Sequence, residues 1–218
     1  MTTRERVVPV SSTAMERFMD FLDTIAGETY PEAPSEPHQS VTSIMLEQIL
    51  GSAPFPKPGR ILDVGCGQGP ALDFMRDRGY HAVGITINDE DLRVCRERNH
   101  EVHKMDQSFL DFPPGTFDLV WARHCVEHSV MPYFTLQGFQ RILKPGGFLY
   151  LEVPAPDTSC HHEKNVNHYS VLTRSTWQSL LKRSGFETLW QDDFNFTVPG
   201  GPDTYYMFFS RMTGTRSR

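Results

Sequence analysis

The chain has 218 residues, a net charge of −6 and an ordinary share of apolar residues. This length suits one domain with a sizeable core, and the acidic balance argues against a broad electrostatic footprint for DNA or RNA. No apolar run approaches the roughly 20 residues of a membrane span, and the N-terminus lacks the apolar core of a signal peptide. The 4 cysteines are scattered without a C-x-x-C pair, which indicates free thiols in a reducing cytoplasm.

The first 58 residues are expected to form a helical cap and a linker that precede a core over 59–211. Helically spaced apolar residues and clustered prolines support this interpretation. The expected elements are a helix over 15–27, a loop over 30–37, a helix over 41–50 and a proline-rich linker up to residue 58. After the core, residues 212–218 are expected to form a disordered tail.

From residue 60 the chain alternates between strand and helix patterns, which is typical of a doubly wound α/β fold. A sheet of seven strands is expected, mostly parallel with an antiparallel last strand. The strands are placed at about 61–64, 81–86, 101–105, 117–121, 148–153, 188–198 and 205–211. Helices are expected after Asn88 as N-cap, over 134–143, and up to Gly185 with Thr173 or Ser175 as N-cap. Turns are expected over 144–147 and 199–203.

The most informative segment runs from Ile61 to Gly69 (ILDVGCGQG), where an apolar run and an acid lead into three glycines at alternate positions. It predicts a strand, a turn and a helix start, at which a nucleotide-like ligand can lie against the main chain. A dinucleotide loop would read G-x-G-x-x-G, but Pro70 stands where its last glycine belongs. The segment resembles motif I of class I S-adenosylmethionine (SAM) methyltransferases, roughly hhD-h-G-x-G-x-G.

This resemblance covers about residues 40–211 and includes three further segments in the family's order. They are Met105 to Phe112, Phe117 to His128 and Leu143 to Phe148. The resemblance implies a Rossmann-like fold, with SAM as cofactor and S-adenosylhomocysteine as product. It also implies that the motif I turn contacts the methionine part and ribose, and that its acid holds the turn and the amino group. The acid in the segment Met105 to Phe112 is implied to lie near adenine. The residues at these positions are Gly65, Gly67 and Gly69, then Asp63, then Asp106 followed by Gln107.

One position departs from the family pattern. The family usually ends its second strand with an acid that binds both ribose hydroxyls, whereas this chain has Thr86, and one hydroxyl cannot replace a carboxylate. A branch that resembles the cyclopropane-fatty-acid synthases also has Gly-Ile-Thr here, with a Gln five positions later, where this chain has Asp91. We therefore predict that Thr86 and Asp91, together with Asn88, share the ribose. The alternative is that the acids at 89–91 only favour a helix N-terminus.

Several histidines follow the ends of strands, at positions where residues are expected to face the acceptor. A protonated oxygen or nitrogen acceptor needs a base, and histidine suits this role. We predict catalytic or acceptor-contacting roles for His124, just past the fourth strand, and for His168 and Tyr169, which resemble the family's His-aromatic stretch before its last helix. Arg123 is predicted to meet an anionic group on cofactor or substrate, with a surface ion pair as the alternative.

No metal site is expected, although several histidines lie close in sequence. His124 and His128 are four residues apart, but no H-E-x-x-H string or cysteine partner accompanies them. His161 and His162, together with His168, could bind a metal as well. The Glu-His pair at 127–128 is frequent in the family as a turn-shaping element. Solvated loop histidines are therefore the preferred interpretation.

The expected activity is methyl transfer to an oxygen or nitrogen of a small-molecule acceptor in the cytoplasm. The N-terminal cap and the loop over 161–169 are expected to cover this acceptor. The acidic charge, the compact length and the lack of an appended binding domain favour a small molecule over a macromolecule. Nucleic acid is disfavoured as a partner, because no Asn/Asp-Pro-Pro-aromatic signature follows the fourth strand. A carbon acceptor stays open, and so does a SAM-binding subunit or sensor without activity, for which Thr86 is the reason. The oligomeric state is also open, a homodimer included.

Overall fold

The computed structural model describes residues 9–27 and 36–214, which fall into two compact units, Met1–Tyr30 and Pro31–Arg218. The first unit contains α1 (Ser12–Gly27), a helix with no buried residue, and it confirms the helix predicted over 15–27. Among the helices in these ranges, none has both the length and the apolar character needed to cross a membrane.

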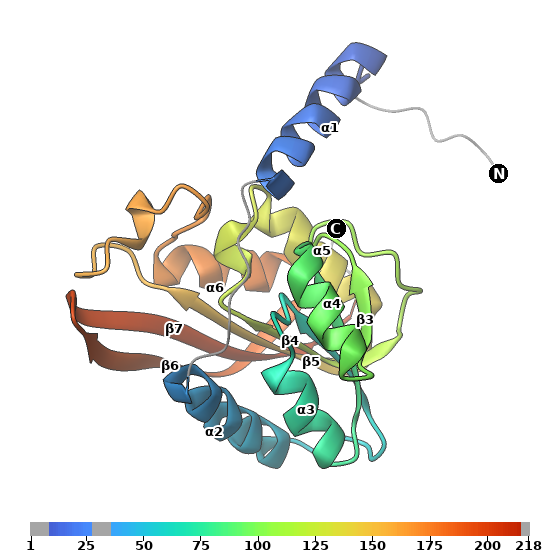
Figure 1. Cartoon of the computed structure of the whole chain (residues 1–218), viewed down its shortest axis with the longest axis vertical. Coiled ribbons are helices and arrows are strands. Elements are labelled where there is room, and N and C mark those ends of the chain that lie inside the picture. The colour runs from blue at the N-terminus through green and yellow to red at the C-terminus, as the bar shows by residue number, and fades with distance from the viewer. Residues whose placement is uncertain (1–8, 28–35, 215–218) are drawn as a thin grey trace. The chain divides into compact units, whose positions relative to one another are not determined.

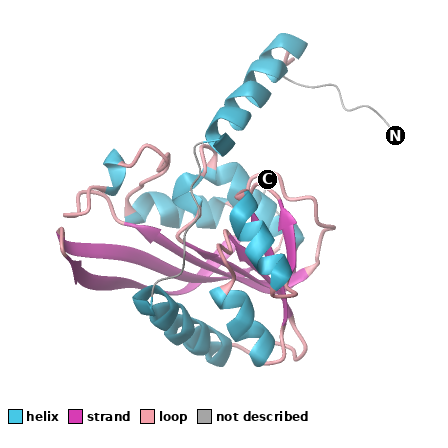
Figure 2. Cartoon of the chain, in the orientation of Figure 1, coloured by secondary structure: helices cyan, strands magenta, loops and turns pink. Residues whose placement is uncertain are grey.

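The second unit is built on one seven-stranded sheet with the order β3-β2-β1-β4-β5-β7-β6. Its strands are β1 (Arg60–Val64), β2 (His81–Thr86), β3 (Glu101–Lys104), β4 (Phe117–Arg123), β5 (Leu143–Pro154), β6 (Phe186–Val198) and β7 (Gly201–Met212). Strands β1 to β5 pair in parallel, and β7 runs antiparallel to both of its neighbours. This arrangement confirms the predicted Rossmann-like α/β sheet, which Figure 2 shows between helices.

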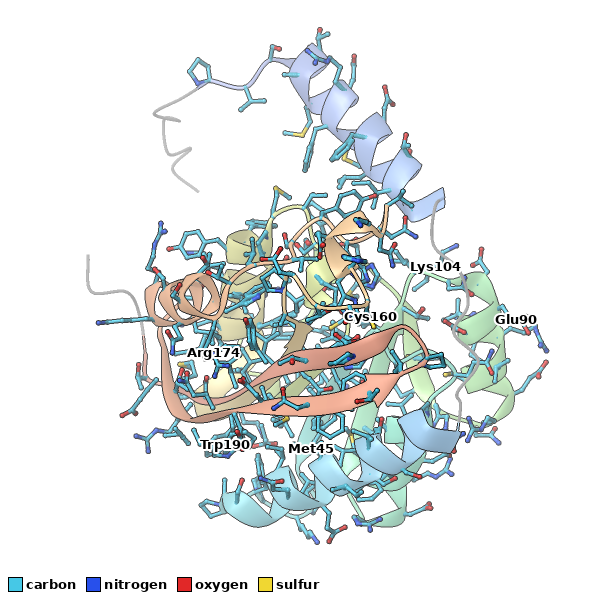
Figure 3. The ribbon with its side chains drawn as sticks, turned by 90° about the vertical axis from the view of Figure 1, so that its left-hand side faces the viewer. Met45, Glu90, Lys104, Cys160, Arg174 and Trp190 are labelled. Carbon is cyan, nitrogen blue, oxygen red and sulfur yellow. The ribbon has the colours of Figure 1, made fainter. Side chains whose placement is uncertain are left out.

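Helices cover both faces of this sheet. They are α2 (Glu36–Ser52), α3 (Pro70–Asp77), α4 (Asp89–Glu97), α5 (Pro132–Ile142) and α6 (Arg174–Arg183), with single 3-10 turns at Val126–His128 and His162–Lys164. In Figure 1, α2 and α3 lie on one face, and α5 and α6 on the other. Each face has its own apolar cluster: Met45 of α2, labelled in Figure 3, packs with Trp121 and Tyr150, and Trp177 of α6 packs with Leu151 on the opposite face.

The strands that follow two expected turns begin earlier than predicted. Strand β5 begins at Leu143, so residues 144–147 form its irregular first part, where the register with β4 shifts between Phe117 and Leu119. Strand β7 begins at Gly201, because pairing with β6 continues to Val198 and leaves two residues for the turn. Both turn predictions were wrong in extent, because strand pairing depends on partners distant in sequence.

The N-terminal boundary and the tail are only partly within the described residues. Most of the loop predicted over 30–37 lies outside them, and its last two residues begin α2. Helix α2, expected in the cap, belongs to the same compact unit as the sheet. Of the predicted tail, Met212 ends β7 and residues 215–218 lie outside the described part. The domain boundary at residue 58 stays a prediction.

Candidate active site

The loop between β1 and α3 presents its main chain at the carboxyl end of the central strands. Its glycines Gly65, Gly67 and Gly69 have φ angles of 67°, 49° and 85°, in the left-handed region that glycine adopts most readily. A Cβ atom at Gly65 would lie 3.0 Å from the Cβ of Cys125, in the turn after β4. The loop therefore packs closely on that turn, and a ligand can approach its backbone at the position where open α/β sheets bind ligands.

Asp63 lies one residue before the end of β1, with only 3% of its surface exposed. Burial raises the pKa of its carboxyl group to about 8, and the positive charge of Arg123 opposes this rise. Its Oδ2 atom is buried and has no hydrogen-bond partner within residues 9–27 and 36–214. Such a carboxyl oxygen beside a glycine loop fits a ligand that brings a hydrogen-bond donor or a positive charge.

The three residues predicted to share a ribose lie where β2 leads into α4. The main-chain N–H groups of Glu90 and Asp91 donate to Oδ1 of Asn88 at 2.9 and 3.1 Å, which confirms Asn88 as the helix cap. The N–H of Asn88 donates to Oγ1 of Thr86 at 3.1 Å. Asp91 is buried, and its charge acts on Cys66 of the glycine loop. These side chains therefore lie beside the loop, although two of them also serve the local turn.

The neighbouring acids of α4 are exposed instead. Asp89 forms an ion pair with Lys104 at 2.6 Å, and Glu90 with Arg93 at 2.7 Å. Figure 3 labels Glu90 and Lys104 at the outer surface. A helix N-terminus explains these two acids but gives no reason to bury Asp91.

The loop after β3 is tied to the same edge of the sheet. The N–H of Ser108 donates to Oδ1 of Asp106 at 2.7 Å, and Nε2 of Gln107 donates to the carbonyl of Cys125 at 2.7 Å. Because Cys125 also contacts the glycine loop, the predicted adenine-side residues lie at the carboxyl edge beside it. The Oε1 atom of Gln107 is buried and lacks a hydrogen-bond partner in the part of the chain that the structure describes.

Glu152, which sequence reasoning missed, is fully buried in β5 and organises the end of β4. Its Oε1 accepts from Nε of Arg123 at 2.8 Å and from Nε2 of His124 at 2.7 Å, and its Oε2 accepts from the hydroxyl of Tyr150. Burial favours the neutral acid, but the hydrogen bond and charge of His124 and the charge of Arg123 together hold the pKa of Glu152 at about 2. The carboxylate is therefore ionised at neutral pH.

Arg123 consequently has an internal partner. Its guanidinium is almost completely buried, and Nη1 also donates to Oγ1 of Thr42 on α2 at 3.0 Å. The ion-pair alternative from the sequence is thus realised, inside the protein rather than at its surface. A direct contact of Arg123 with the cofactor stays a prediction that none of these contacts supports.

His124 follows β4 directly and has a φ of 53°, an uncommon conformation for a residue with a side chain. Its ring stacks on Tyr205 of β7 with centroids 4.1 Å apart. Tyr205 meets His162 edge to face at 5.4 Å, and His162 stacks on His168 at 5.6 Å. The structure therefore joins His124 and His168, predicted separately, through a row of rings that includes two residues the sequence analysis left unassigned.

The Glu-His turn after β4 holds the loop that carries His168. Nδ1 of His128 hydrogen-bonds to the carbonyl of Asn167 at 2.8 Å, and the N–H of Ser170 donates to the carbonyl of Glu127 at 2.9 Å. These contacts confirm the turn-shaping role expected for this pair.

The imidazole of His168 is less basic than usual. Burial, then the charges of His128 and His162, lower its pKa to about 4, so it is neutral at pH 7. It meets His128 edge to face at 4.7 Å. The adjacent Tyr169 is 37% exposed.

Residues 42–198 match the model of a family described as a methyltransferase domain, which is well over half of the chain. The chain belongs to this family. It is a class I SAM-dependent methyltransferase. This membership confirms the resemblance drawn from the glycine segment and the enzyme class predicted from it.

Curated relatives share the domain at moderate identity. A 27-O-demethylrifamycin SV methyltransferase of Amycolatopsis mediterranei is 26% identical over 79% of this chain and 71% of that protein. A ubiquinone biosynthesis O-methyltransferase of Paracidovorax citrulli is 29% identical over 55% of this chain and 53% of that protein. A sterol 24-C-methyltransferase of Gibberella zeae is 28% identical over 72% of this chain and 47% of that protein. The chain thus spans about half the length of the last two.

A solved structure has the same fold. The Burkholderia thailandensis 1,6-didemethyltoxoflavin-N1-methyltransferase, with its substrate and S-adenosylhomocysteine bound, has a TM-score of 0.64 at 18% identity. The similarity covers 96% of this chain and 94% of that one.

SAM is accordingly the cofactor, and the residues present fit it. The glycine loop leaves its main chain uncovered, and the buried Oδ2 of Asp63 offers an acceptor to the positively charged amino group of the methionine part. These features suit SAM.

Proposed function

We propose that the protein transfers a methyl group from SAM to an oxygen or nitrogen of a small molecule, with His124 as general base. The observation that carries this proposal is the contact of His124 with Glu152, at the carboxyl end of β4 and next to the glycine loop. A buried ionised carboxylate that holds an imidazole in place is the usual support of a histidine base.

The cofactor would be held by the three elements that meet at this edge. In the proposal, Gly65, Gly67 and Gly69 face the methionine part and the ribose, and Asp63 accepts hydrogen bonds from the amino group. Asp91 takes the ribose hydroxyls, with Thr86 and Asn88 shaping the turn below them, and Asp106 and Gln107 lie on the adenine side. The burial of Asp91, compared with its exposed neighbours, supports its place in the site.

The bound cofactor supplies a methyl group already activated on a sulfonium, so the protein has to align an acceptor, exclude water and remove a proton. In the proposal, His124 takes the acceptor's proton, and the contact of its Nε2 with the ionised Glu152 orients the ring. His168, neutral at pH 7 because its pKa is about 4, is suited to hydrogen-bond the acceptor rather than to deprotonate it. Tyr169 provides an exposed aromatic ring beside it.

The names of the relatives favour oxygen as the acceptor atom. Two of them act on oxygen by name, and the sterol methyltransferase acts on carbon. A hydroxyl loses a proton on methylation, which gives a histidine base a role, so His124 fits an oxygen or nitrogen acceptor.

The test is a turnover assay that detects S-adenosylhomocysteine over panels of phenols, aliphatic alcohols, amines and carbon nucleophiles. His124→Asn should lower kcat by about 10²–10⁴-fold on the preferred acceptor and leave the Kd for S-adenosylhomocysteine unchanged. Tight cofactor binding without turnover on any panel would instead support a binding protein without activity. Unchanged kcat in His124→Asn would refute the base assignment.

A further inference from the structure

A thiol, an imidazole and a carboxylate meet at His162, which lies between Tyr205 and His168 in the row of rings. Cys160 and His162 lie in the segment after β5, and Asp203 lies in β7. One ligand atom of each lies within 4.8 Å of the other two. Nε2 of His162 is 3.1 and 3.0 Å from Oδ1 and Oδ2 of Asp203. Neither the cofactor proposal nor the base proposal uses these three side chains.

The main chain holds the two segments against each other. The N–H of Ala155 donates to the carbonyl of Thr204 at 2.9 Å, and the N–H of Ser159 donates to the carbonyl of Pro202 at 3.2 Å. A Cβ atom at Gly201 would lie 2.7 Å from Oγ of Ser159, so this approach requires glycine. Figure 3 shows Cys160 beside the end of the β6–β7 hairpin. The three donors are thus placed by the fold and not by one flexible loop alone.

We propose that Cys160, His162 and Asp203 bind a zinc ion. Sulfur, nitrogen and oxygen donors together suit Zn²⁺, whereas Mg²⁺ and Ca²⁺ prefer oxygen alone. Zinc bonds of about 2.0–2.3 Å place neighbouring ligand atoms within the separation found here. Three protein ligands leave a fourth position, which a water molecule or a ligand oxygen fills.

The surroundings of the three side chains suit an ion that enters from solvent. The side chain of Asp203 is 3% exposed and that of His162 13%, while Cys160 is partly exposed. Tyr205 and His168 pack on the ring of His162 and fix its orientation, as outer-shell residues of metal sites do.

A second group, Glu127, His128 and His168, has similar spacing. It carries the weaker case because the group has no thiol. Ligand spacing in the sequence could not indicate this group, since Asp203 comes 41 residues after His162.

The experiment uses the full chain, made without a polyhistidine tag and freed of metal with a chelator. Zn²⁺ is titrated in competition with a chromogenic chelator, and Co²⁺ is added separately to record its absorption spectrum. We expect one equivalent of Zn²⁺ and a thiolate-to-cobalt charge-transfer band. Cys160→Ser should abolish the band, and Cys160→Ser or His162→Asn should weaken zinc binding by more than the roughly 10–100-fold that outer-shell changes cost.

His161→Asn is the matched control, since this neighbour lies outside the group and asparagine tolerates its φ of 49°. It should bind zinc like the wild type. Circular dichroism of the metal-free variants separates lost binding from lost folding, and the conservative Cys160→Ser carries the test if His162→Asn fails to fold. The proposal is overturned if the wild type shows no charge-transfer band. It is equally overturned if Cys160→Ser binds zinc normally, or if binding is lost only in His128→Asn.

Discussion

Asp63 links stability to pH in the cofactor-free protein. Because burial raises its folded-state pKa from 3.8 to about 8, the folded state holds a proton that the unfolded chain has lost. Its contribution is complete below about pH 4 and disappears as the pH rises through 8. We expect the free energy of unfolding of the wild type to fall over this window relative to Asp63→Asn, by up to about 1.4 kcal/mol per pH unit. Urea titrations at pH 5 to 8 measure this, and the exposed Asp77→Asn should keep the wild-type slope.

The same protonation predicts a pH-dependent affinity for the cofactor. If Asp63 receives a positively charged amino group, it has to lose its proton on binding. The Kd for S-adenosylhomocysteine should then fall by about tenfold for each unit of pH toward 8. Isothermal titration calorimetry at several pH values checks this slope, which Asp63→Asn should remove. A wild-type Kd that does not depend on pH would take Asp63 out of the cofactor site.

Glu152 and Arg123 form a buried ion pair, in which the loss of one charge leaves the other buried without a partner. In Glu152→Gln the buried guanidinium of Arg123 loses its carboxylate partner, so we expect a loss of about 3–5 kcal/mol in the free energy of unfolding. The double variant Arg123→Met/Glu152→Gln should lose less than the sum of the single changes, because it removes the unpaired charge. Urea denaturation of the four proteins measures the coupling. Additive losses would mean that the two side chains do not depend on each other.

At the scale of the element, Asn88 caps α4 and is also predicted to take part in cofactor binding. Two cap variants distinguish these roles. Asn88→Ala removes the acceptor of two main-chain N–H groups and should cost about 1 kcal/mol of stability. Thr173→Ala removes the corresponding cap of α6 and should cost a similar amount. Only the Asn88 change should also weaken S-adenosylhomocysteine binding, because α4 carries Asp91. Equal affinities in both variants, measured by calorimetry, would leave Asn88 with a purely structural role.

The sequence predicted the bounds of those helices and strands whose ends depend on residues nearby in the chain. The strand His81–Thr86 and the cap Asn88 were found correctly, because apolar runs and capping side chains act within a few residues. Of the two caps predicted for α6, the structure has Thr173. The start of β7 was missed because its pairing partner, and not its own sequence, extends it to Gly201. The same distinction holds for the candidate active site. The glycine loop is contiguous in sequence, whereas Glu152 meets His124 only through the pairing of β4 with β5.

At the scale of the whole molecule, the chain divides into a small N-terminal unit and a larger one that carries every proposed binding residue. The larger unit has its own apolar clusters on both faces of the sheet, with Leu46 and Ile49 of α2 fully buried in one of them. In the described part of the smaller unit, α1 buries none of its residues and exposes Met19 and Phe21. Stability should therefore reside in the larger unit.

A chain that lacks residues 1–27 tests this division and the predicted cap function together. Because the larger unit contains the apolar clusters, the truncated chain should keep the midpoint of urea unfolding and the Kd for S-adenosylhomocysteine. If the N-terminal segment covers the acceptor, kcat/KM for the acceptor should fall, because a covered site excludes water and orients its substrate. Substituting Met19→Ser and Phe21→Ser in the full chain is the matched control, since it keeps the length and removes the exposed apolar side chains. Full activity of the truncated chain would refute the cap function, and a collapse of its stability would refute the independence of the larger unit.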